Sequence, residues 1–463
     1  MNTHRTVVGS RTLSCAALGL LAGSAAHADL NLVPGMTPVQ APVAATIQTI
    51  CPPLNSPNRQ PTLTPEQRNL AISCTRMVHT SNAQQGSGGT AQSLGLTESG
   101  LRDALQGIAP EEMNAQNRGR TVSSHAPVNA RLLALRRGAG GGPLASGLEF
   151  NGRYVTLDEL LPAGSRGGGA SADGGLGGPW SGFLNGHYNW GKRDASALES
   201  GFDFDDYGLV IGADYRFSDA TVVGVALSYA KSKADFKNDG GDVESSNTGI
   251  SAYASHSTGN GYVEGFVGYT KVDFDTARRI LVVSTTSVEG FDTVARGSTD
   301  ADQFTLSIGG GYDWVSGETT VTPFARLSYL HLKVDGFTER EDTHSLGLDI
   351  RGRSVTSLQS ALGVQYTRAI SHASGVLTPY VGIEWNHEFR NNSGEIVAKY
   401  THDPFNAFFA IPTASPDRNF FTLRAGLGSV YASGWSAFAN LDHVLGLKDT
   451  RATSLTVGMR KEF

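Results

Sequence analysis

The stretch LTVGMRKEF, Leu455–Phe463, stands at the end of the sequence and has two different faces when it is drawn as an extended strand. Side chains alternate between the two faces of a strand. One face carries Thr, Gly, Arg and Glu. The other carries four apolar side chains, those of Leu455, Val457, Met459 and Phe463. An apolar strand of this kind would promote aggregation at the edge of a soluble sheet, but it suits a strand that closes a barrel in lipid.

The composition of the chain also favours a β protein. Glycine accounts for 57 of 463 residues, and charged residues make up 17%. The glycine share is well above the usual ~7%. Beyond the first 28 residues, no run approaches the ~18 apolar residues that a membrane helix needs, so we expect any membrane span to be a β-barrel. The net charge of −6 predicts no nucleic-acid partner.

Residues 1–28 have the pattern of a secretory signal peptide. Two arginines precede a short apolar core, and Ala26-His27-Ala28 is a cleavage site of the A-x-A kind. We expect the mature chain to begin at Asp29. Cys15 raises the alternative of a lipoprotein signal, but there the apolar run precedes the cysteine, and here it follows.

Cys51 and Cys74 are the only cysteines of the expected mature chain. An exported pair of cysteines predicts one disulfide, formed in the oxidising periplasm. Two free thiols or a partial metal site are the alternatives, although no His or Asp stands at ligand spacing around them.

The region 29–137 is predicted to be a short passenger or N-terminal helical region. Residues 29–50 show no helical stripe and are expected to be extended and disordered. Helices are predicted over 62–79, which the disulfide would join to the preceding segment, and from Thr97 onwards. Residues 127–137 form a short basic amphipathic helix whose arginines contact headgroups, lie in a pore or are solvated.

A glycine-rich linker over 138–179 leads to a change of pattern at Trp180. From there to residue 463 apolar and polar residues alternate, most clearly in DDYGLVIGADYRFS (205–218) and DQFTLSIGGGYDWVS (302–316). We predict twelve strands, near residues 180–190, 205–217, 220–233, 246–256, 261–274, 301–315, 319–334, 353–369, 376–390, 419–432, 435–445 and 452–463.

The predicted connections alternate strictly between short and long. The long ones are 191–204, 234–245, 275–300, 335–352 and 391–418. Short periplasmic turns and long outer loops are typical of an outer-membrane barrel, whereas a soluble β-sandwich has no reason for such alternation. The fold class is therefore predicted to be a 12-stranded antiparallel outer-membrane β-barrel after a small, mostly helical or disordered region.

The region from residue 180 onwards resembles the translocator domain of classical autotransporters. The resemblance covers TPFARLSYLHL at 322–332, TPYVGIEWNHEF at 378–389 and GLKDTRATSLTVGMRKEF at 446–463, in matching order. It implies an outer-membrane barrel that exports a passenger, with a helix in the pore. Because the residues directly before Trp180 are glycine-rich, that helix is left open between 98–118 and 127–137.

The resemblance also implies an insertion signal in the last strand, formed by Leu455, Val457, Met459 and Phe463, from which Lys461 departs. The implied partners are outer-membrane lipid, the barrel-assembly machinery and periplasmic chaperones, and the passenger's ligand is left open. A charged lumen able to solvate a threading chain is predicted from seven inward positions: Asp206, Asp214, Arg216, Arg326, Gln365, Glu384 and Arg424.

No catalytic, cofactor or metal site is predicted. The G-x-S-x-G elbow is absent. Residues 186–192 match most of a phosphate loop, but Arg193 follows where Ser or Thr is needed. DFKNDGGD at 235–242 lacks the closing Glu of a calcium loop, and His387-Glu388 has no second His for zinc.

Two hypotheses follow from these observations. In the first, an autotransporter barrel exports and displays a short non-enzymatic passenger, which is either released or retained. In the second, a stand-alone barrel, porin-like or enzymatic, carries a periplasmic N-terminal domain or plug. The disulfide favours the second hypothesis, because a bridged helix pair threads a narrow pore less readily, whereas the family resemblance favours the first.

Overall fold

The computed structural model describes most of the chain. The described residues are 29–111, 113, 132, 149–150, 153–154, 179–218, 220–372, 375–390, 394–431 and 434–462. The predicted signal peptide 1–28, most of the predicted linker 138–179 and the terminal Phe463 lie outside them.

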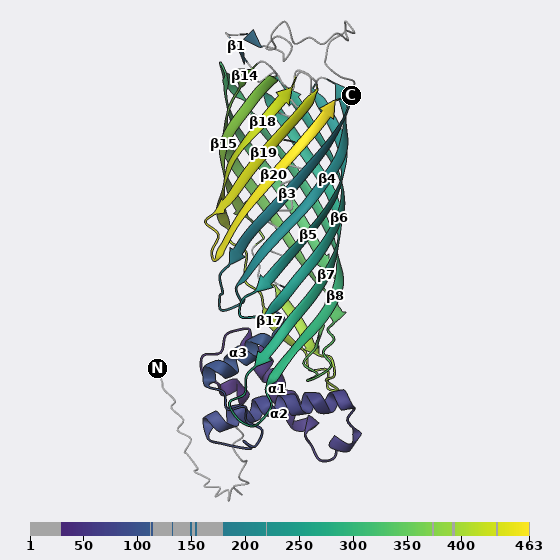
Figure 1. The fold of residues 1–463 in the computed structure, drawn as a ribbon, viewed down its shortest axis with the longest axis vertical. Helices are drawn as coiled ribbons and strands as arrows, with labels where there is room; N and C mark the ends of the chain where they lie inside the picture. Colours follow the sequence, from purple (N-terminus) through teal and green to yellow (C-terminus); the bar gives the residue numbers. More distant parts are fainter. Residues whose placement is uncertain are drawn as a thin grey trace, which may run out of the picture.

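Twelve long antiparallel strands form a closed barrel (Figure 1). Successive strands pair, and the last pairs with the first, with Leu455 opposite Tyr188. This confirms the predicted strand number. The strands are β3 Trp180–Arg193, β4 Phe202–Ser218, β5 Thr221–Phe236, β6 Gly241–Thr258, β7 Gly261–Val282, β8 Phe291–Tyr312, β10 Thr319–Val334, β13 Arg353–Arg368, β15 Gly375–Glu388, β18 Asn419–Tyr431, β19 Trp435–Leu445 and β20 Thr450–Glu462. Two short strands, β9 Trp314–Ser316 and β14 Ile370–His372, extend β8 and β13.

The two faces of each strand differ in exposure. On β20, Leu455, Val457 and Met459 are 39%, 48% and 50% exposed, whereas Thr456 and Arg460 on the other face are 2% and 6% exposed. Apolar side chains therefore point outward, toward the position of lipid, and polar ones point into the barrel. This arrangement is typical of outer-membrane barrels.

Two strand pairs run further than the sequence predicted. Residues 234–245 and 275–300 were expected to be loops, but β5 and β6 leave only 237–240 between them, and β7 and β8 leave only 283–290. The inward side chains of the β7 extension, such as Ile280 and Val282, are buried in an apolar core outside the barrel. Tertiary packing thus stabilises strand pairs whose own sequence gives a weak signal.

The two longest outer connections also contain strands. β11 Phe337–Thr338, β12 Leu348–Ile350, β16 Glu395–Tyr400 and β17 Phe409–Pro412 pair in that order into a four-stranded sheet, here called the outer sheet. The sequence predicted only loops over 335–352 and 391–418. The strands are too short to be recognised singly, and the pairing of β12 with β16 joins two different connections.

Residues 29–111, here called the N-terminal unit, are largely helical. Thr64 and Gln67 form a capping box at the start of α2, and Thr97 caps α3. Its elements are η1 Leu30–Leu32, α1 Gln40–Leu54, η2 Gln60–Thr62, α2 Pro65–Gln85 and α3 Glu98–Ile108. No helix in the described ranges is long and apolar enough to cross a membrane.

The expected disorder of residues 29–50 is wrong. Val43, Ile47, Ile50 and Leu54 recur at intervals of three and four residues and are all buried in α1. This stripe was overlooked because the segment is uncharged and ends on Pro52 and Pro53. The helix is stable here because its apolar face packs against α2 and α3.

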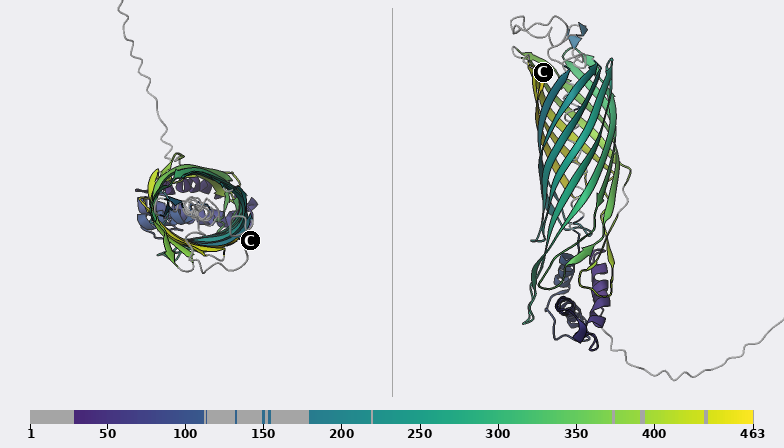
Figure 2. Two further views of the ribbon diagram at one scale, coloured as in Figure 1. Left: turned by 90° about the horizontal axis from the view of Figure 1, so that it is seen from above. Right: turned by 90° about the vertical axis from the view of Figure 1, so that its right-hand side faces the viewer.

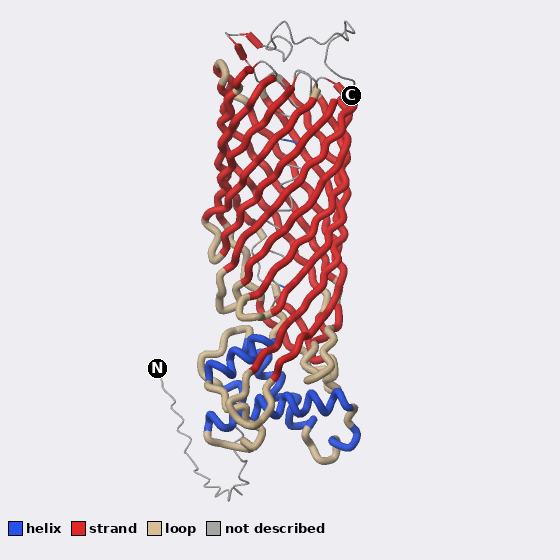
Figure 3. Tube along the Cα trace, in the orientation of Figure 1, coloured by secondary structure: helices blue, strands red, loops and turns tan. Residues whose placement is uncertain are grey.

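The N-terminal unit lies at the end of the barrel that carries the long connections (Figures 1 and 3). A view along the barrel shows the helices across this end (Figure 2). The start of β3, the end of β20 and the small hairpin of β1 Glu149–Phe150 and β2 Arg153–Tyr154 lie at the opposite end, with the short turns (Figure 1). The helices of the N-terminal unit and this hairpin, which both precede the barrel in sequence, thus lie at its two opposite ends.

Candidate functional site

A chain of alternating charges crosses one wall of the barrel interior. Arg326 Nη2 lies 2.7 Å from Glu384 Oε1, and Arg424 Nη1 lies 3.9 Å from Glu384 Oε2. Arg424 Nε also donates to Asp442 Oδ1 at 2.8 Å. The structure thus brings together three of the predicted lumen residues. Asp442 was missed, although its alternation with the outward Leu441 was a usable signal.

A second group joins the first and last strands near the short-turn end. Asp214 accepts hydrogen bonds from Ser181 Oγ at 2.6 Å and Tyr253 OH at 3.1 Å. Arg460 Nη2 of β20 lies 3.8 Å from Asp214 Oδ1. These contacts connect strands at the seam where the barrel closes.

The remaining predicted lumen residues lie apart from these two groups. Asp206 contacts His187 Nε2 at 3.1 Å and accepts from Asn189 Nδ2 at 2.5 Å. Gln365 Nε2 donates to Thr367 Oγ1 at 3.1 Å. Arg216 lies half-buried on the inward face of β4 near the short turns. The interior is therefore polar along much of its length.

Leu132 is the one described residue between 113 and 149, and it is buried inside the barrel. It packs in an apolar cluster with inward residues that include Phe183, Val210 and Tyr253. The rest of the predicted helix 127–137 lies outside the described residues. The other pore candidate began at residue 98, and its described part, α3, lies outside the barrel instead (Figure 1).

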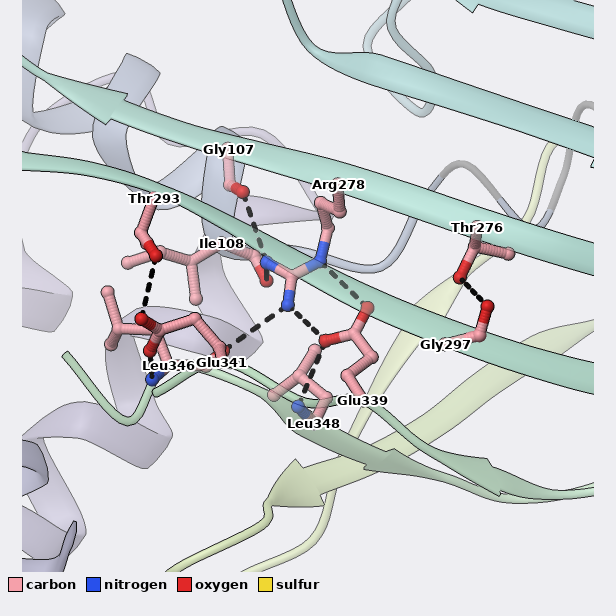
Figure 4. A network of polar contacts seen from close by, with 10 residues as sticks. All are labelled: Gly107, Ile108, Thr276, Arg278, Thr293, Gly297, Glu339, Glu341, Leu346 and Leu348. Carbon is pink, nitrogen blue, oxygen red and sulfur yellow. Dashed lines mark hydrogen bonds and ion pairs between the residues drawn. The ribbon is translucent and has the colours of Figure 1, made fainter. Parts of the chain in front are cut away.

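Arg278 fastens the end of α3 to the barrel (Figure 4). It lies on the inward face of the β7 extension, and its Nη1 donates to Ile108 O at 2.8 Å and Gly107 O at 3.2 Å. These two carbonyl groups lie at the C-terminus of α3, where they accept no hydrogen bond within the helix. The negative end of the helix dipole also favours a cation at this position. Arg278 also pairs with Glu339, and both side chains are 2% exposed.

Two carboxylates organise the outer connection 335–352 around this arginine (Figure 4). Glu339 accepts from Leu348 N at 2.9 Å. Glu341 accepts from Leu346 N and Thr293 Oγ1, both at 2.7 Å, and from two further backbone N–H groups. Burial opposes the charge of Glu341, but these hydrogen bonds prevail and lower its pKa below the ordinary value.

A second strip of contacts joins the N-terminal unit to the tip of the β7–β8 hairpin. Thr285 N donates to Leu94 O at 2.9 Å, and Thr286 Oγ1 donates to Ser93 O at 2.7 Å. On α2, Ser73 Oγ donates to His344 O at 2.9 Å. These bonds place helices, hairpin and outer sheet in one assembly, here called the cap.

The cap has a single apolar core. Fully buried Leu70 and Met77 of α2 belong to the same cluster as Phe291 of β8, Leu348 of β12 and Ile411 of β17. The N-terminal unit therefore completes the core of the outer loops, and neither part buries its apolar surface alone.

The predicted disulfide is confirmed. Cys51 of α1 and Cys74 of α2 are bonded, with their Cα atoms 5.6 Å apart. Both residues are buried, at 4% and 2% exposure. Asn55 Nδ2 donates to Thr75 Oγ1 at 2.9 Å beside the bridge. The bridge thus joins the two longest helices of the N-terminal unit.

The weak chemical motifs of the sequence fall on barrel strands. Residues 186–192 lie within β3, and 235–242 span the end of β5, its turn and the start of β6. His387 of β15 contacts Asn419 Oδ1 at 2.9 Å and the ring of Phe389. Across the described part of the chain, no three His, Cys, Asp or Glu residues gather to hold a metal ion.

A closed β-barrel with an apolar exterior, a charged interior, short turns at one end and long connections at the other defines an outer-membrane barrel. The family model for the autotransporter beta-domain matches residues 182–442, more than half of the chain. The chain belongs to this family, and it is an outer-membrane autotransporter protein. Its barrel lies in the bacterial outer membrane.

Curated relatives are similar over the barrel region. Outer membrane protein A of Rickettsia conorii is 27% identical over 205 residues, which are 43% of this chain and 10% of that protein. An extracellular serine protease of Serratia marcescens is 23% identical over 255 residues, 54% of this chain and 23% of that protein. These matches therefore span only about a tenth to a quarter of the relatives' length.

Solved structures of the same kind are also similar. The translocator domain of the autotransporter NalP from Neisseria meningitidis matches with a TM-score of 0.49 and 18% identity, covering 62% of this chain and 90% of that one. The beta domain of the Bordetella autotransporter BrkA matches with a TM-score of 0.45 and 15% identity, covering 62% and 100%.

The insertion signal of the last strand stays a prediction. Deleting Phe463 is expected to reduce the assembled barrel to a small fraction of its normal amount, because the family resemblance implies that the terminal aromatic residue belongs to the insertion signal. The amount of heat-modifiable protein in outer-membrane fractions measures this. Phe463→Tyr keeps an aromatic end and is expected to assemble normally. Equal levels of the deletion and the parent would reject the signal.

Proposed function

We propose that the barrel exports its own N-terminal unit and holds it at the cell surface as part of the cap. One observation carries this proposal: the unit docks at the long-connection end, while the chain enters β3 at the short-turn end (Figure 1). Long connections face outward in outer-membrane barrels. The N-terminal unit therefore belongs on the outer side.

Leu132 supports a route through the barrel. It is 1% exposed and packs against the inward side chains of Phe183 and Val210. In sequence, Leu132 stands between the N-terminal unit at the outer end and the β1–β2 hairpin at the short-turn end (Figure 1), and its place inside the barrel supports a route along the lumen. A polar interior satisfies the backbone of such a chain, which lipid does not.

Retention of the unit follows from the same contacts. The core shared with Phe291 and Leu348, together with the buried pair of Arg278 and Glu339, ties the unit to the outer loops. We infer that the unit remains attached after export and closes the outer mouth. Its surroundings there are extracellular, which suits the bond between Cys51 and Cys74.

The exported unit acts in this proposal as a surface domain without enzymatic activity. Its described residues form a compact helical unit, and no known catalytic motif occurs in its sequence. Outer-membrane lipid contacts the apolar exterior of the barrel, and the assembly machinery recognises the last strand. The alternative of a periplasmic domain requires the helices at the short-turn end, and they lie at the other end (Figure 1).

An epitope inserted between Gly88 and Gly89 tests the proposal. These residues are exposed in the connection between α2 and α3. We expect antibody to bind this epitope on intact cells, because the unit has crossed the membrane. An epitope in 391–393, within the connection from β15 to the outer sheet, is expected to be exposed as well and controls for barrel assembly.

An epitope in the short turn at Gly259 and Asn260 supplies the opposite control. It is expected to bind antibody only after the outer membrane has been opened. If the epitope at Gly88 behaved like this turn while the one at 391–393 was exposed, the N-terminal unit would be periplasmic and the proposal would fail.

A further inference from the structure

Glu111 occupies the point at which the N-terminal unit meets the barrel mouth. It follows α3 by three residues and is 4% exposed. Gln106 Nε2 of α3 donates to its Oε2 at 2.5 Å, and Ser200 Oγ donates to its Oε1. Ser200 lies in the connection 194–201 between β3 and β4. The Glu111 carboxyl thus bridges the unit and the barrel.

We propose that Glu111 is an acid-tightened latch, which holds the N-terminal unit on the barrel mouth while its carboxyl is protonated and loosens it when the carboxyl ionises. The latch concerns the docked state of the unit. It does not depend on the route by which the unit reached the outer end.

The charges around Glu111 favour the neutral carboxyl. Among the described residues, no Lys, Arg or His lies within ion-pair distance of it. Glu199, the neighbour of Ser200, is 2% exposed and pairs with Arg193, whose Nη1 also donates to Thr450 Oγ1 at 2.7 Å. The positive charge of Arg193 is therefore balanced by Glu199. An ionised Glu111 would add a second buried negative charge beside this pair.

Burial raises the pKa of Glu111 to about 7 from an ordinary value of 4.5, and it does so against the hydrogen bonds from Ser200 and Gln106. The Glu199 carboxylate raises it further. Below pH 4.5 the carboxyl is neutral in both docked and released states. Between 4.5 and about 7 the released state loses its proton first, so docking weakens as the pH rises, and above about 7 the loss is complete.

The test compares the rate of trypsin cleavage at Arg76 of α2, whose side chain is 13% exposed in the docked unit, in the full-length protein and in Glu111→Gln, in detergent micelles at several pH values. The ratio of the two rates cancels the protease's own pH dependence. We expect the rate in the parent divided by the rate in Glu111→Gln to rise on the order of tenfold or more between about pH 5 and about pH 8. Glu98 is an exposed carboxylate at the start of α3. The cleavage rate of Glu98→Gln should therefore depend on pH in the same way as that of the parent.

A ratio that stays flat across this range would overturn the latch. If Glu111→Gln assembled poorly, Ser200→Ala would serve as the second test. This variant removes a donor that stabilises the ionised Glu111 carboxylate. The pH at which the cleavage rate is halfway between its low and high values should therefore be higher than in the parent. A midpoint that did not move would equally overturn the proposal.

Discussion

Replacing Arg278 with methionine is expected to release the N-terminal unit from the barrel mouth. The change removes the donors to Gly107 O and Ile108 O and leaves Glu339, at 2% side-chain exposure, without its cation. Removing one partner of a buried ion pair costs about 3–5 kcal/mol. The urea concentration at which protease begins to cleave the connection between α2 and α3 measures the loss. We expect it to fall well below that of the parent, while the barrel itself stays folded.

Arg279→Met is a matched control on the same strand. Arg279 points away from the cap core and pairs with Asp292 at 3.2 Å and Asp239 at 3.5 Å, whose side chains are 65% and 75% exposed. Exposed pairs of this kind contribute about 0–1 kcal/mol. Both variants remove one positive charge and gain the same side chain. Equal effects at the two positions would show that Arg278 does not anchor α3.

Removing the disulfide is expected to destabilise the same unit by roughly 3 kcal/mol, through the double change Cys51→Ala and Cys74→Ala. The two residues are 23 positions apart, and a bridge over that separation restricts the unfolded chain by about this amount. The urea profile of cleavage in the N-terminal unit again measures the effect. Heat-modifiability of the barrel should not change, because the bridge joins α1 to α2 and touches no barrel strand.

Reduction provides an independent comparison. The parent protein treated with a reducing agent during unfolding should shift toward the profile of the double variant, and the double variant should not respond to the reducing agent. An unchanged profile for the double variant would mean that packing of α1 on α2 holds the unit without the bridge. A loss of assembled barrel would instead place the role of the bridge before membrane insertion.

The architecture of the barrel was predictable because each spanning strand faces lipid on one side and a polar interior on the other. This requirement makes apolar and polar residues alternate along each strand, as in Leu455 to Arg460 or Tyr207 to Phe217. The predicted inward position of Glu384 follows from the same rule. The rule does not predict which charges lie next to Glu384. Arg326, Arg424 and Asp442 come from three other strands, and only the register of the closed barrel brings them together with Glu384.

The sequence by itself determined the barrel, its strand number, its two faces and the cysteine pair, since each depends on local periodicity or on residue type. Only the tertiary structure decided where the N-terminal unit lies and what holds it. Arg278 and Arg279 are adjacent and look alike in the sequence, yet one is buried against α3 and the other is half-buried, paired with exposed aspartates. The helix α1, the outer sheet and the extended β7–β8 hairpin are stable because they complete one another's apolar core, and no local pattern records a partner that is hundreds of residues away.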